Sequence, residues 1–361
     1  MSTVLNFNAG PAALPPPVLE QARAELRDYR GSGMSIMEMS HRSQEYEAIN
    51  ARAEATFKRL LGVDAGYRAL FVQGGASTQF ATVPMNFLPP GGVADYVVTG
   101  TWGEKAIEEA KVLGGANLAA STKGGNYDRV PAGGEIQLSP DPAYVHLTSN
   151  ETIQGVQFPE FPEVGDRPLV ADMSSDIMSR PFDASKFALL YAGAQKNLGP
   201  AGVTVVLIRE SWMERANKGV PTMFRYSTHA KNNSLYNTPP TFGVYLLDLV
   251  LGWVAAQGGL AGMAARNAAK AGALYGAIDR SGGYYRGHAE PGSRSNMNVT
   301  FRLPDEAAEK KLLAEAQAAG MVGLAGHRSV GGVRASIYNA TDGEACQALA
   351  SFLGDFAAKN G

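Results

Sequence analysis

The sequence Phe187-Ala-Leu-Leu-Tyr-Ala-Gly-Ala-Gln-Lys-Asn-Leu-Gly-Pro-Ala-Gly202 joins a strongly apolar run to a turn. The continuous apolar residues predict a strand buried on both faces, and the Gly and Pro that follow predict where it ends. Lys196 lies at this end. Burial there would lower the pKa of its amine, as Schiff-base chemistry requires. Lys196 is therefore a candidate nucleophile.

Strand-like and helix-like patterns alternate on both sides of this stretch. Short apolar runs predict strands at 68–72, 94–98, 143–147, 168–171, 188–191 and 203–208. Helical periodicity lies between them, for example at 43–61 and 103–113. This alternation predicts an α/β fold with a mixed, mostly parallel sheet flanked by helices.

The pattern changes after about residue 259. An Ala-rich helix is followed by a predicted strand, helix, strand and helix at 297–302, 305–319, 332–338 and 343–358. This order indicates a small α+β domain. We therefore expect a large domain at 17–258 and a small domain formed by 1–16 and 259–361. The Pro-rich segment 10–17 is expected to pack on the small domain rather than to start the sheet.

Composition narrows the class of protein. With 361 residues, 45% apolar content and a formal charge of −2, the chain can bury a large core, and its charge argues against nucleic-acid binding. The opening residues do not resemble a signal peptide, so we expect a cytoplasmic protein. The apolar stretch 242–263 contains Asp248, Gln257 and five glycines, which favours a buried helix over a membrane span.

The cysteine content argues against two further classes of site. The single cysteine, Cys346, fits a helical packing pattern with Leu349, so a role in packing is expected rather than reactivity. One cysteine forms no disulfide framework, and nothing in the sequence resembles a Cys/His metal site.

An aldehyde cofactor on Lys196 would require partner groups. Pyridoxal phosphate needs a carboxylate at its ring nitrogen. Asp172 ends a predicted strand that precedes the lysine strand, so both side chains would lie at the carboxyl edge of the sheet, where α/β proteins bind ligands. Considered alone, Asp172 is better interpreted as a helix cap or turn aspartate.

Two further features suit the same cofactor. The segment 73–80 follows a strand and precedes a helix, so its small residues let the backbone approach a phosphate, with Ser77 adding a hydroxyl. Trp102 could stack on the pyridine ring. Gly-Gly turns before helices are common and an isolated tryptophan is usually part of a core, so the interpretation depends on the combination.

These motifs and several others resemble the phosphoserine aminotransferases, a family in class V of the fold type I pyridoxal-phosphate enzymes. The resemblance runs essentially end to end, with matching motifs at 6–13, 40–42, 150–152, 191–197, 236–242, 326–328 and 334–339. It implies that Lys196 forms the Schiff base, Asp172 lies at the ring nitrogen, Trp102 stacks on the ring and Thr152 bonds the phenolic oxygen. It also implies phosphate contacts from Ala76, Ser77, Gln195 and, across an obligate homodimer, Asn237 and Thr238.

Five basic side chains are candidates for substrate binding. They are His41, Arg42, His327, Arg328 and Arg334. The planar fork of arginine suits carboxylate and phosphate alike, although either His-Arg pair alone would be interpreted as surface charge or a helix cap. The resemblance implies that Arg334 holds the α-carboxylate and that the two pairs hold the distal anion, one pair coming from the neighbouring subunit.

The resemblance implies reversible amino transfer between L-glutamate and 3-phosphohydroxypyruvate, giving O-phospho-L-serine and 2-oxoglutarate. Some relatives also use 4-phosphohydroxy-L-threonine in pyridoxine biosynthesis. Three alternatives stay open: a class V aminotransferase for other substrates, a cysteine desulfurase with a reactive cysteine, and a non-catalytic phosphate-binding protein. The chain departs from some members by Ala9 in place of a serine and by Gly74-Gly-Ala-Ser77 in place of Gly-Gly-Gly-Arg. Backbone amides and a hydroxyl would then hold the phosphate.

Overall fold

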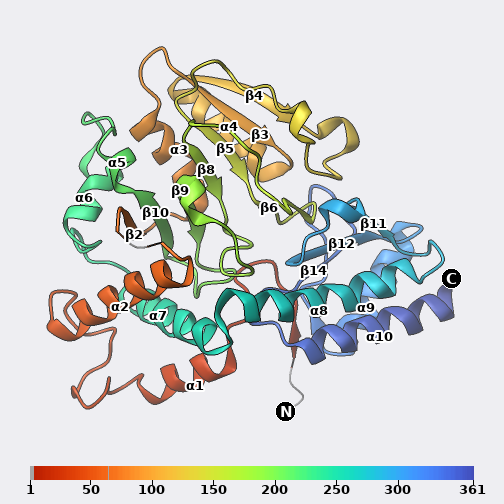
Figure 1. Ribbon diagram of the computed structural model, residues 1–361. Coiled ribbons are helices and arrows are strands. Elements are labelled where there is room, and N and C mark those ends of the chain that lie inside the picture. Colours follow the sequence, from red (N-terminus) through yellow and green to blue (C-terminus); the bar gives the residue numbers. More distant parts are fainter. Residues whose placement is uncertain (1–3, 64) are drawn as a thin grey trace.

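A seven-stranded sheet forms the centre of the computed structural model, which describes residues 4–63 and 65–361 (Figure 1). Its strand order is β2-β10-β9-β8-β5-β3-β4. The bounds are β2 (Tyr67–Val72), β3 (Val93–Val98), β4 (Gly115–Ser121), β5 (Val145–Thr148), β8 (Leu169–Asp172), β9 (Phe187–Gly193) and β10 (Thr204–Arg209). Only β10 runs antiparallel to its neighbours, so the predicted mixed, mostly parallel sheet is confirmed.

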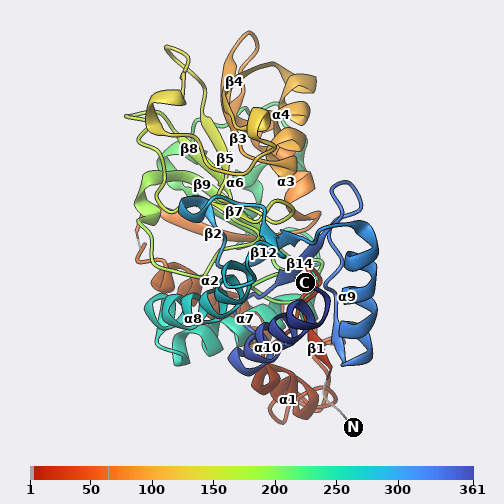
Figure 2. The same cartoon turned by 90° about the vertical axis from the view of Figure 1, so that its right-hand side faces the viewer.

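Helices cover both faces of this sheet (Figures 1 and 2). One face packs against α1 (Pro16–Ala24), α2 (Gln44–Leu60) and α7 (Thr241–Ala256), and the other against α3 (Gly75–Phe87), α4 (Thr101–Leu113), α5 (Glu210–Met213) and α6 (Tyr226–Lys231). In β2, Phe71 belongs to the first core and Leu70 to the second, because successive strand side chains point to opposite faces. Both faces are therefore apolar, as the continuous run at 187–193 predicted.

A third core lies beside the large sheet, at the right of Figure 1. It is built from α8 (Gly259–Asp279), β11 (Arg286–Gly287), β12 (Asn298–Arg302), α9 (Glu306–Ala318), β14 (Val333–Ser336) and α10 (Gly343–Asn360). The strands form an antiparallel sheet in the order β11-β12-β14. This separate core supports a small domain that starts near residue 259, and the exact division stays a prediction.

Cys346 is fully buried in this third core, on α10. Burial raises the pKa of its thiol to about 11, so the thiolate needed for a nucleophile is disfavoured. The packing role predicted from the helical pattern is confirmed. The structure thus offers no support for a cysteine desulfurase.

The N-terminal segment joins both parts of the molecule. Strand β1 (Leu5–Asn6) pairs in parallel with β13 (Met321–Val322) of the small part. The expectation that segment 10–17 packs on the small domain was wrong in part, because Leu14 packs against the core of α1, α2 and α7. The amide of Ala12 also donates to the carbonyl of Gln195 at 2.9 Å. These contacts satisfy backbone groups as the chain crosses beside the lysine turn.

Two elements differ from the sequence prediction. Strand β4 was not predicted, because it is an edge strand with weak alternation and an exposed Leu118. The stretch 242–263 is not one helix. It breaks between α7 and α8, where Gly258 and Gly259 have φ values of 86° and 64°.

No single helix among the described residues is long and apolar enough to cross a membrane. Helices α7 and α8 satisfy the length and composition criteria only when taken together, and they are bent by 82° at their junction.

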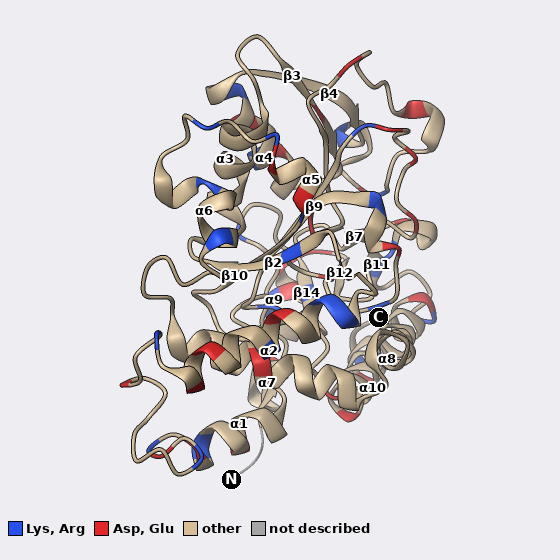
Figure 3. Ribbon diagram, turned by 60° about the vertical axis from the view of Figure 1, so that its left-hand side comes forward, with Lys and Arg blue, Asp and Glu red and all other residues tan. Residues whose placement is uncertain are grey.

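Basic and acidic residues are both spread along the ribbon (Figure 3). One acidic residue in the apolar helix α7, Asp248, is buried and accepts from Arg52 Nε of α2 at 3.0 Å. Burial raises the pKa of Asp248, and the Arg52 guanidinium opposes this shift. This charge is therefore explained by packing between two helices.

Candidate active site

Three predicted site residues meet at the carboxyl edge of the large sheet. Asp172 is the last residue of β8, Lys196 follows β9, and Thr152 follows β5 and the short strand β6 (Asn150–Glu151). Strands β9, β8 and β5 are parallel neighbours, so their carboxyl ends lie side by side. The fold brings these residues to the edge where open α/β sheets bind ligands.

The amine of Lys196 forms a hydrogen bond with a side chain that follows another strand. Its Nζ atom donates to Oγ1 of Thr152 at 2.7 Å. Burial lowers the pKa of Lys196 to about 8, an effect opposed mainly by Asp172 and reinforced by Arg334. Near pH 7, the neutral fraction of this amine is therefore far larger than that of an exposed lysine. The neutral form is the nucleophile, so the lowered pKa favours nucleophilic chemistry.

Asp172 is a buried carboxylate that accepts a hydrogen bond from the amide of Ser174 at 2.9 Å. This is the turn contact that the alternative interpretation of Asp172 predicted. The hydroxyl oxygen of Ser174 in turn accepts from the amide of Gly193 at 3.0 Å, which ties the ends of β8 and β9 together. Burial raises the pKa of Asp172, and Ser174 and Lys196 oppose the shift. Asp172 is therefore both a turn residue and a charge next to the lysine.

Trp102 lies in the first turn of α4, and Lys196 Nζ is 5.6 Å from the centre of its ring. The indole Nε1 is buried and has no hydrogen-bond partner among the described residues. Trp102 thus presents an aromatic face toward the lysine amine, as a ring-stacking residue would.

The Gly74-Gly75 turn leads directly into helix α3. Gly74 has a φ of 97°, and a Cβ atom there would lie 2.0 Å from Oγ1 of Thr78. Only glycine fits this position. The first helical turn contains Ala76 and Ser77, whose amides have no acceptor within the helix and are available to an anion.

The small part of the molecule contributes Arg334, from β14. Its Nη1 atom donates to the carbonyl of Thr152 at 3.4 Å, and its buried Nε has no partner among the described residues. Burial lowers the pKa of His327, and the nearby charges of Arg334 and Arg328 lower it further. Arg334 therefore lies beside Thr152, and His327 lies close enough to Arg334 and Arg328 for both charges to act on it.

The loop 326–332, which contains His327 and Arg328, is anchored from β12. Arg302 donates to the carbonyl of Val330, and its Nη1 lies 3.3 Å from the carboxylate of Glu309. Gly332 has a φ of 75°, and a Cβ there would lie 2.8 Å from Cδ of Arg302. The role of this arginine was not predicted from the sequence, because its target is a backbone carbonyl, which no residue type marks.

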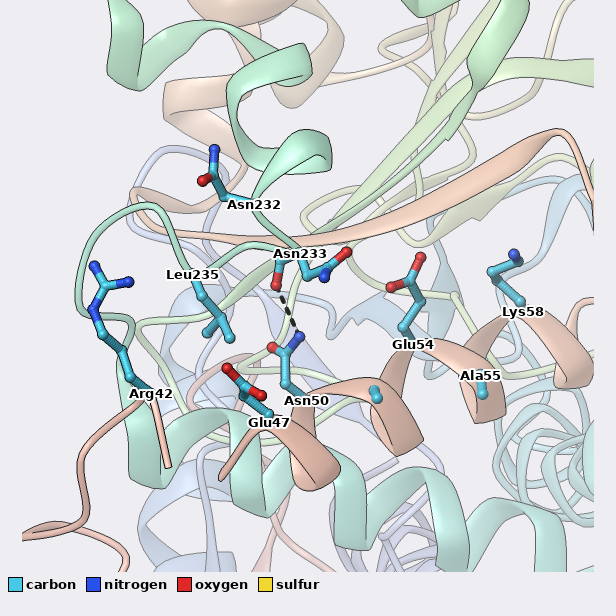
Figure 4. A pocket seen from close by; sticks show the side chains of 10 residues that line it. Arg42, Glu47, Asn50, Glu54, Ala55, Lys58, Asn232, Asn233 and Leu235 are labelled. Atoms are coloured by element: carbon cyan, nitrogen blue, oxygen red, sulfur yellow. Dashed lines mark hydrogen bonds between the residues drawn. The ribbon is translucent and has the colours of Figure 1, made fainter. Parts of the chain in front are cut away.

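Within one chain, Arg42 lies on another surface, and Nε2 of the preceding His41 is buried without a hydrogen-bond partner among the described residues. Arg42 is exposed at a cavity of about 580 Å³ between α2 and the segment that contains Asn233 and Leu235 (Figure 4). Among the described residues, no hydrogen bond or salt bridge joins His41 or Arg42 to Lys196. Among these residues, no hydrogen bond joins the first His-Arg pair to the second either.

Four other positions singled out in the sequence are also located. Asn237 Nδ2 donates weakly to Gln73 Oε1 of the same chain at 3.4 Å, and Thr238 beside it is exposed. The half-buried Gln195 precedes the lysine. The carbonyl of Ala9 accepts from the hydroxyl of Tyr338 at 2.8 Å.

Four features together define a class of enzyme. They are a lysine with a lowered pKa, a buried aspartate at the end of the neighbouring strand, an aromatic ring beside the lysine, and a helix N-terminus with free amides for a phosphate. This is the class of the pyridoxal-phosphate-dependent aminotransferases. The family model for class-V aminotransferases matches residues 4–349, which agrees with this class.

Comparison with individual relatives shows which family within this class the chain belongs to. The chain is 65% identical to the phosphoserine aminotransferase of Herpetosiphon aurantiacus, over 99% of this chain and 100% of the relative. It is 52% identical to that of Bacillus subtilis, over the full length of both. The solved phosphoserine aminotransferase from Bacillus circulans subsp. alkalophilus superposes with a TM-score of 0.98 at 56% identity, over 100% of both chains. The chain belongs to the phosphoserine aminotransferase family of class-V aminotransferases.

Proposed function

We propose that the chain reversibly transfers the amino group between L-glutamate and 3-phosphohydroxypyruvate, giving O-phospho-L-serine and 2-oxoglutarate. Support comes from the family and from the placement of a buried arginine beside the lysine. The observation that favours this function most is the chain of contacts Arg334–Thr152–Lys196, since it sets a carboxylate-binding group beside the reactive amine.

The described residues fit pyridoxal phosphate. The indole face of Trp102 and the side chain of Asp172 suit its ring, and Thr152 suits the phenolic oxygen. The helix start at Ala76 and Ser77 suits its phosphate, with Gln195 beside the lysine. When bound, this cofactor supplies the electron sink that acidifies the Cα proton of the amino acid, and Asp172 would keep the ring nitrogen protonated.

Lys196 would move the proton at the substrate Cα. Its pKa of about 8 lies near working pH, so Nζ can accept this proton and give it back. Thr152 would orient Nζ through the 2.7 Å hydrogen bond. Arg334 would hold the α-carboxylate, which fixes Cα within reach of the amine.

The distal anion requires a second set of cations. The γ-carboxylate of glutamate and the phosphate of phosphoserine lie at comparable distances from an amino-acid Cα, so one basic pocket can serve both. His327 and Arg328 would provide one side of this pocket. His41 and Arg42 would reach it from a second subunit, since Arg42 lines a separate cavity of this chain. Asn237 and Thr238 would likewise complete the neighbour's phosphate site, and the working unit would be a homodimer.

Substrate specificity can be tested by single-turnover absorbance measurements of the bound cofactor. O-phospho-L-serine and L-glutamate should each convert the cofactor to its amine form, whereas serine and leucine should be at least tenfold slower at the same concentration. Including 4-phosphohydroxy-L-threonine would show whether the site also accepts a substrate of pyridoxine biosynthesis. Fast reaction with uncharged amino acids would contradict the proposal.

A further inference from the structure

A buried carboxylate outside the predicted site contacts the helix that contains Trp102. Glu151 has none of its surface exposed. Its two carboxylate oxygens accept from the amides of Trp102 at 3.0 Å and Gly103 at 2.8 Å. Among the described residues, no lysine or arginine forms a salt bridge with it. Its partners are therefore the backbone donors at the start of α4.

Every free donor in the first turn of α4 is satisfied from the same segment. The helix is preceded by Gly100, which has no side chain to cap it. The amide of Thr101 is 3.5 Å from Oε1 of Gln154, whose Nε2 also donates to the Thr101 hydroxyl at 2.9 Å. With the two bonds to Glu151, residues 151–154 replace the missing N-cap.

The glycines of this turn make room for the carboxylate. A Cβ atom on Gly100 would lie 2.5 Å from Cγ and Cδ of Glu151. At Gly103, a Cβ would lie 3.3 Å from the Cα of Val98 and 3.4 Å from Oε1 of Glu151. The backbone of α4 and the carboxylate are thus packed directly against each other, which leaves little freedom for the helix start to move.

The charge of Glu151 depends on these amides. Burial raises its pKa to about 7, and the bonds from Gly103 and Trp102 are the main factors that oppose this shift. A carboxylate at a helix N-terminus is also favoured by the helix dipole.

We propose that Glu151 is a positioning residue that fixes the first turn of α4 and thereby holds the Trp102 indole against the cofactor position at Lys196. This inference rests on the proposed stacking role of Trp102. Glu151 itself touches backbone amides and acts through the tryptophan.

The test uses the holoenzyme in a Trp212→Phe, Trp253→Phe background, so that Trp102 is the only fluorophore of its kind. Glu151→Gln keeps one acceptor oxygen and places an NH₂ group opposite the other amide. Gly100→Ala displaces the carboxylate by steric overlap without changing charge. The matched control is Glu104→Gln on the same helical turn, because Glu104 bonds Lys123 and Tyr127 rather than the amide of Trp102.

Both Glu151→Gln and Gly100→Ala should raise acrylamide quenching of Trp102 fluorescence and weaken cofactor binding roughly tenfold, the effect of losing about one charge-assisted hydrogen bond. Glu104→Gln should change neither. Unchanged quenching and affinity in both variants, or equal changes in the control, would overturn the proposal. If Glu151→Gln does not fold, Gly100→Ala decides alone. The stacking role of Trp102 is tested separately, by adding cofactor to the background protein. If the cofactor does not quench Trp102 fluorescence, the stacking role is contradicted, whatever the result with acrylamide.

Discussion

Lys196 and Thr152 are joined by a hydrogen bond of 2.7 Å, although they follow different strands of the sheet. The same threonine accepts from Arg334 through its carbonyl. Thr152 therefore connects the reactive amine to the arginine of the small part, and the consequences of breaking this link can be measured.

Replacing Thr152 by valine removes the hydroxyl and preserves the shape of the side chain. We expect kcat for phosphoserine to fall roughly 10–100-fold, because a hydrogen bond to a charged or titrating group contributes about 1.5–3 kcal/mol. Steady-state kinetics would measure the change. Thr148→Val is the matched control, since the Thr148 hydroxyl is buried and has no hydrogen-bond partner in the described part of the chain. Equal losses in both variants would argue against a role for the Lys196 contact.

The lowered pKa of Lys196 predicts a stability difference in the cofactor-free protein. Its pKa is about 8 when folded against an ordinary 10.5, so the folded state binds its proton less tightly than the unfolded chain. The resulting destabilisation is complete below pH 8 and is relieved as pH rises from 8 to 10.5.

Lys196→Met should therefore raise the Tm of the cofactor-free protein at pH 7, and the gain should shrink toward pH 10.5. Thermal unfolding followed by circular dichroism at several pH values would measure it. A constant difference across this range would show that the amine titrates normally.

Mixed dimers test the sharing of the active site. We expect Arg42→Ala and Lys196→Ala homodimers to be nearly inactive with phosphoserine. Co-expression with two affinity tags should yield a purified mixed dimer in which one of the two sites has both residues intact. Before this purification, a random equal mixture should show about one quarter of the wild-type activity. About half of its dimers are mixed, and each mixed dimer has one intact site of two.

If both residues of a site came from one chain, mixed dimers would show no recovery. Arg59→Ala is the control for the Arg42 change, since Arg59 is another exposed arginine, on α2. It should retain activity. Arg42→Ala should also leave cofactor affinity unchanged, and an equal loss of affinity and turnover would indicate a folding or assembly defect.

Arg302 should affect substrate binding from outside the site. Arg302→Ala removes its contacts to Val330 and Glu309, so the loop with His327 becomes less fixed. KM for phosphoserine should rise about 5–10-fold, as expected for the loss of roughly one hydrogen bond, with little change in kcat. Arg286→Ala is the control, because Arg286 pairs with Arg302 across β11 and β12 and donates to the carbonyl of Leu303 rather than to that of Val330. Unchanged KM would contradict the anchoring role.

The buried strands were the most predictable elements. Strands β8 and β9 are continuous apolar runs with both faces covered by helices, so composition alone indicates them. Strand β4 was missed because it lies at the sheet edge, where only Ala119 and Ala120 of its seven residues are buried and the pattern is weak. The break at Gly258 was not predicted either, since glycines are tolerated within helices and only their backbone angles show the bend.

The local pairs of site residues were also predictable. Lys196 and Asp172 end predicted strands, and parallel strands place such residues at one edge. The contact of Glu151 with Trp102 joins residues 49 positions apart and depends on where α4 begins, so the acidic residue in the motif 150–152 gave no indication of its partner.

The sequence by itself determined the α/β alternation, the lysine at the end of a buried strand and the identity of the basic side chains, because these properties depend on residue type and local order. Only the tertiary structure decided that Thr152 links Lys196 to Arg334, that Arg302 holds the loop of His327, and that Arg42 lies apart from them in one chain. These contacts join distant segments, and their geometry follows from how helices and strands pack rather than from the pattern of any one segment.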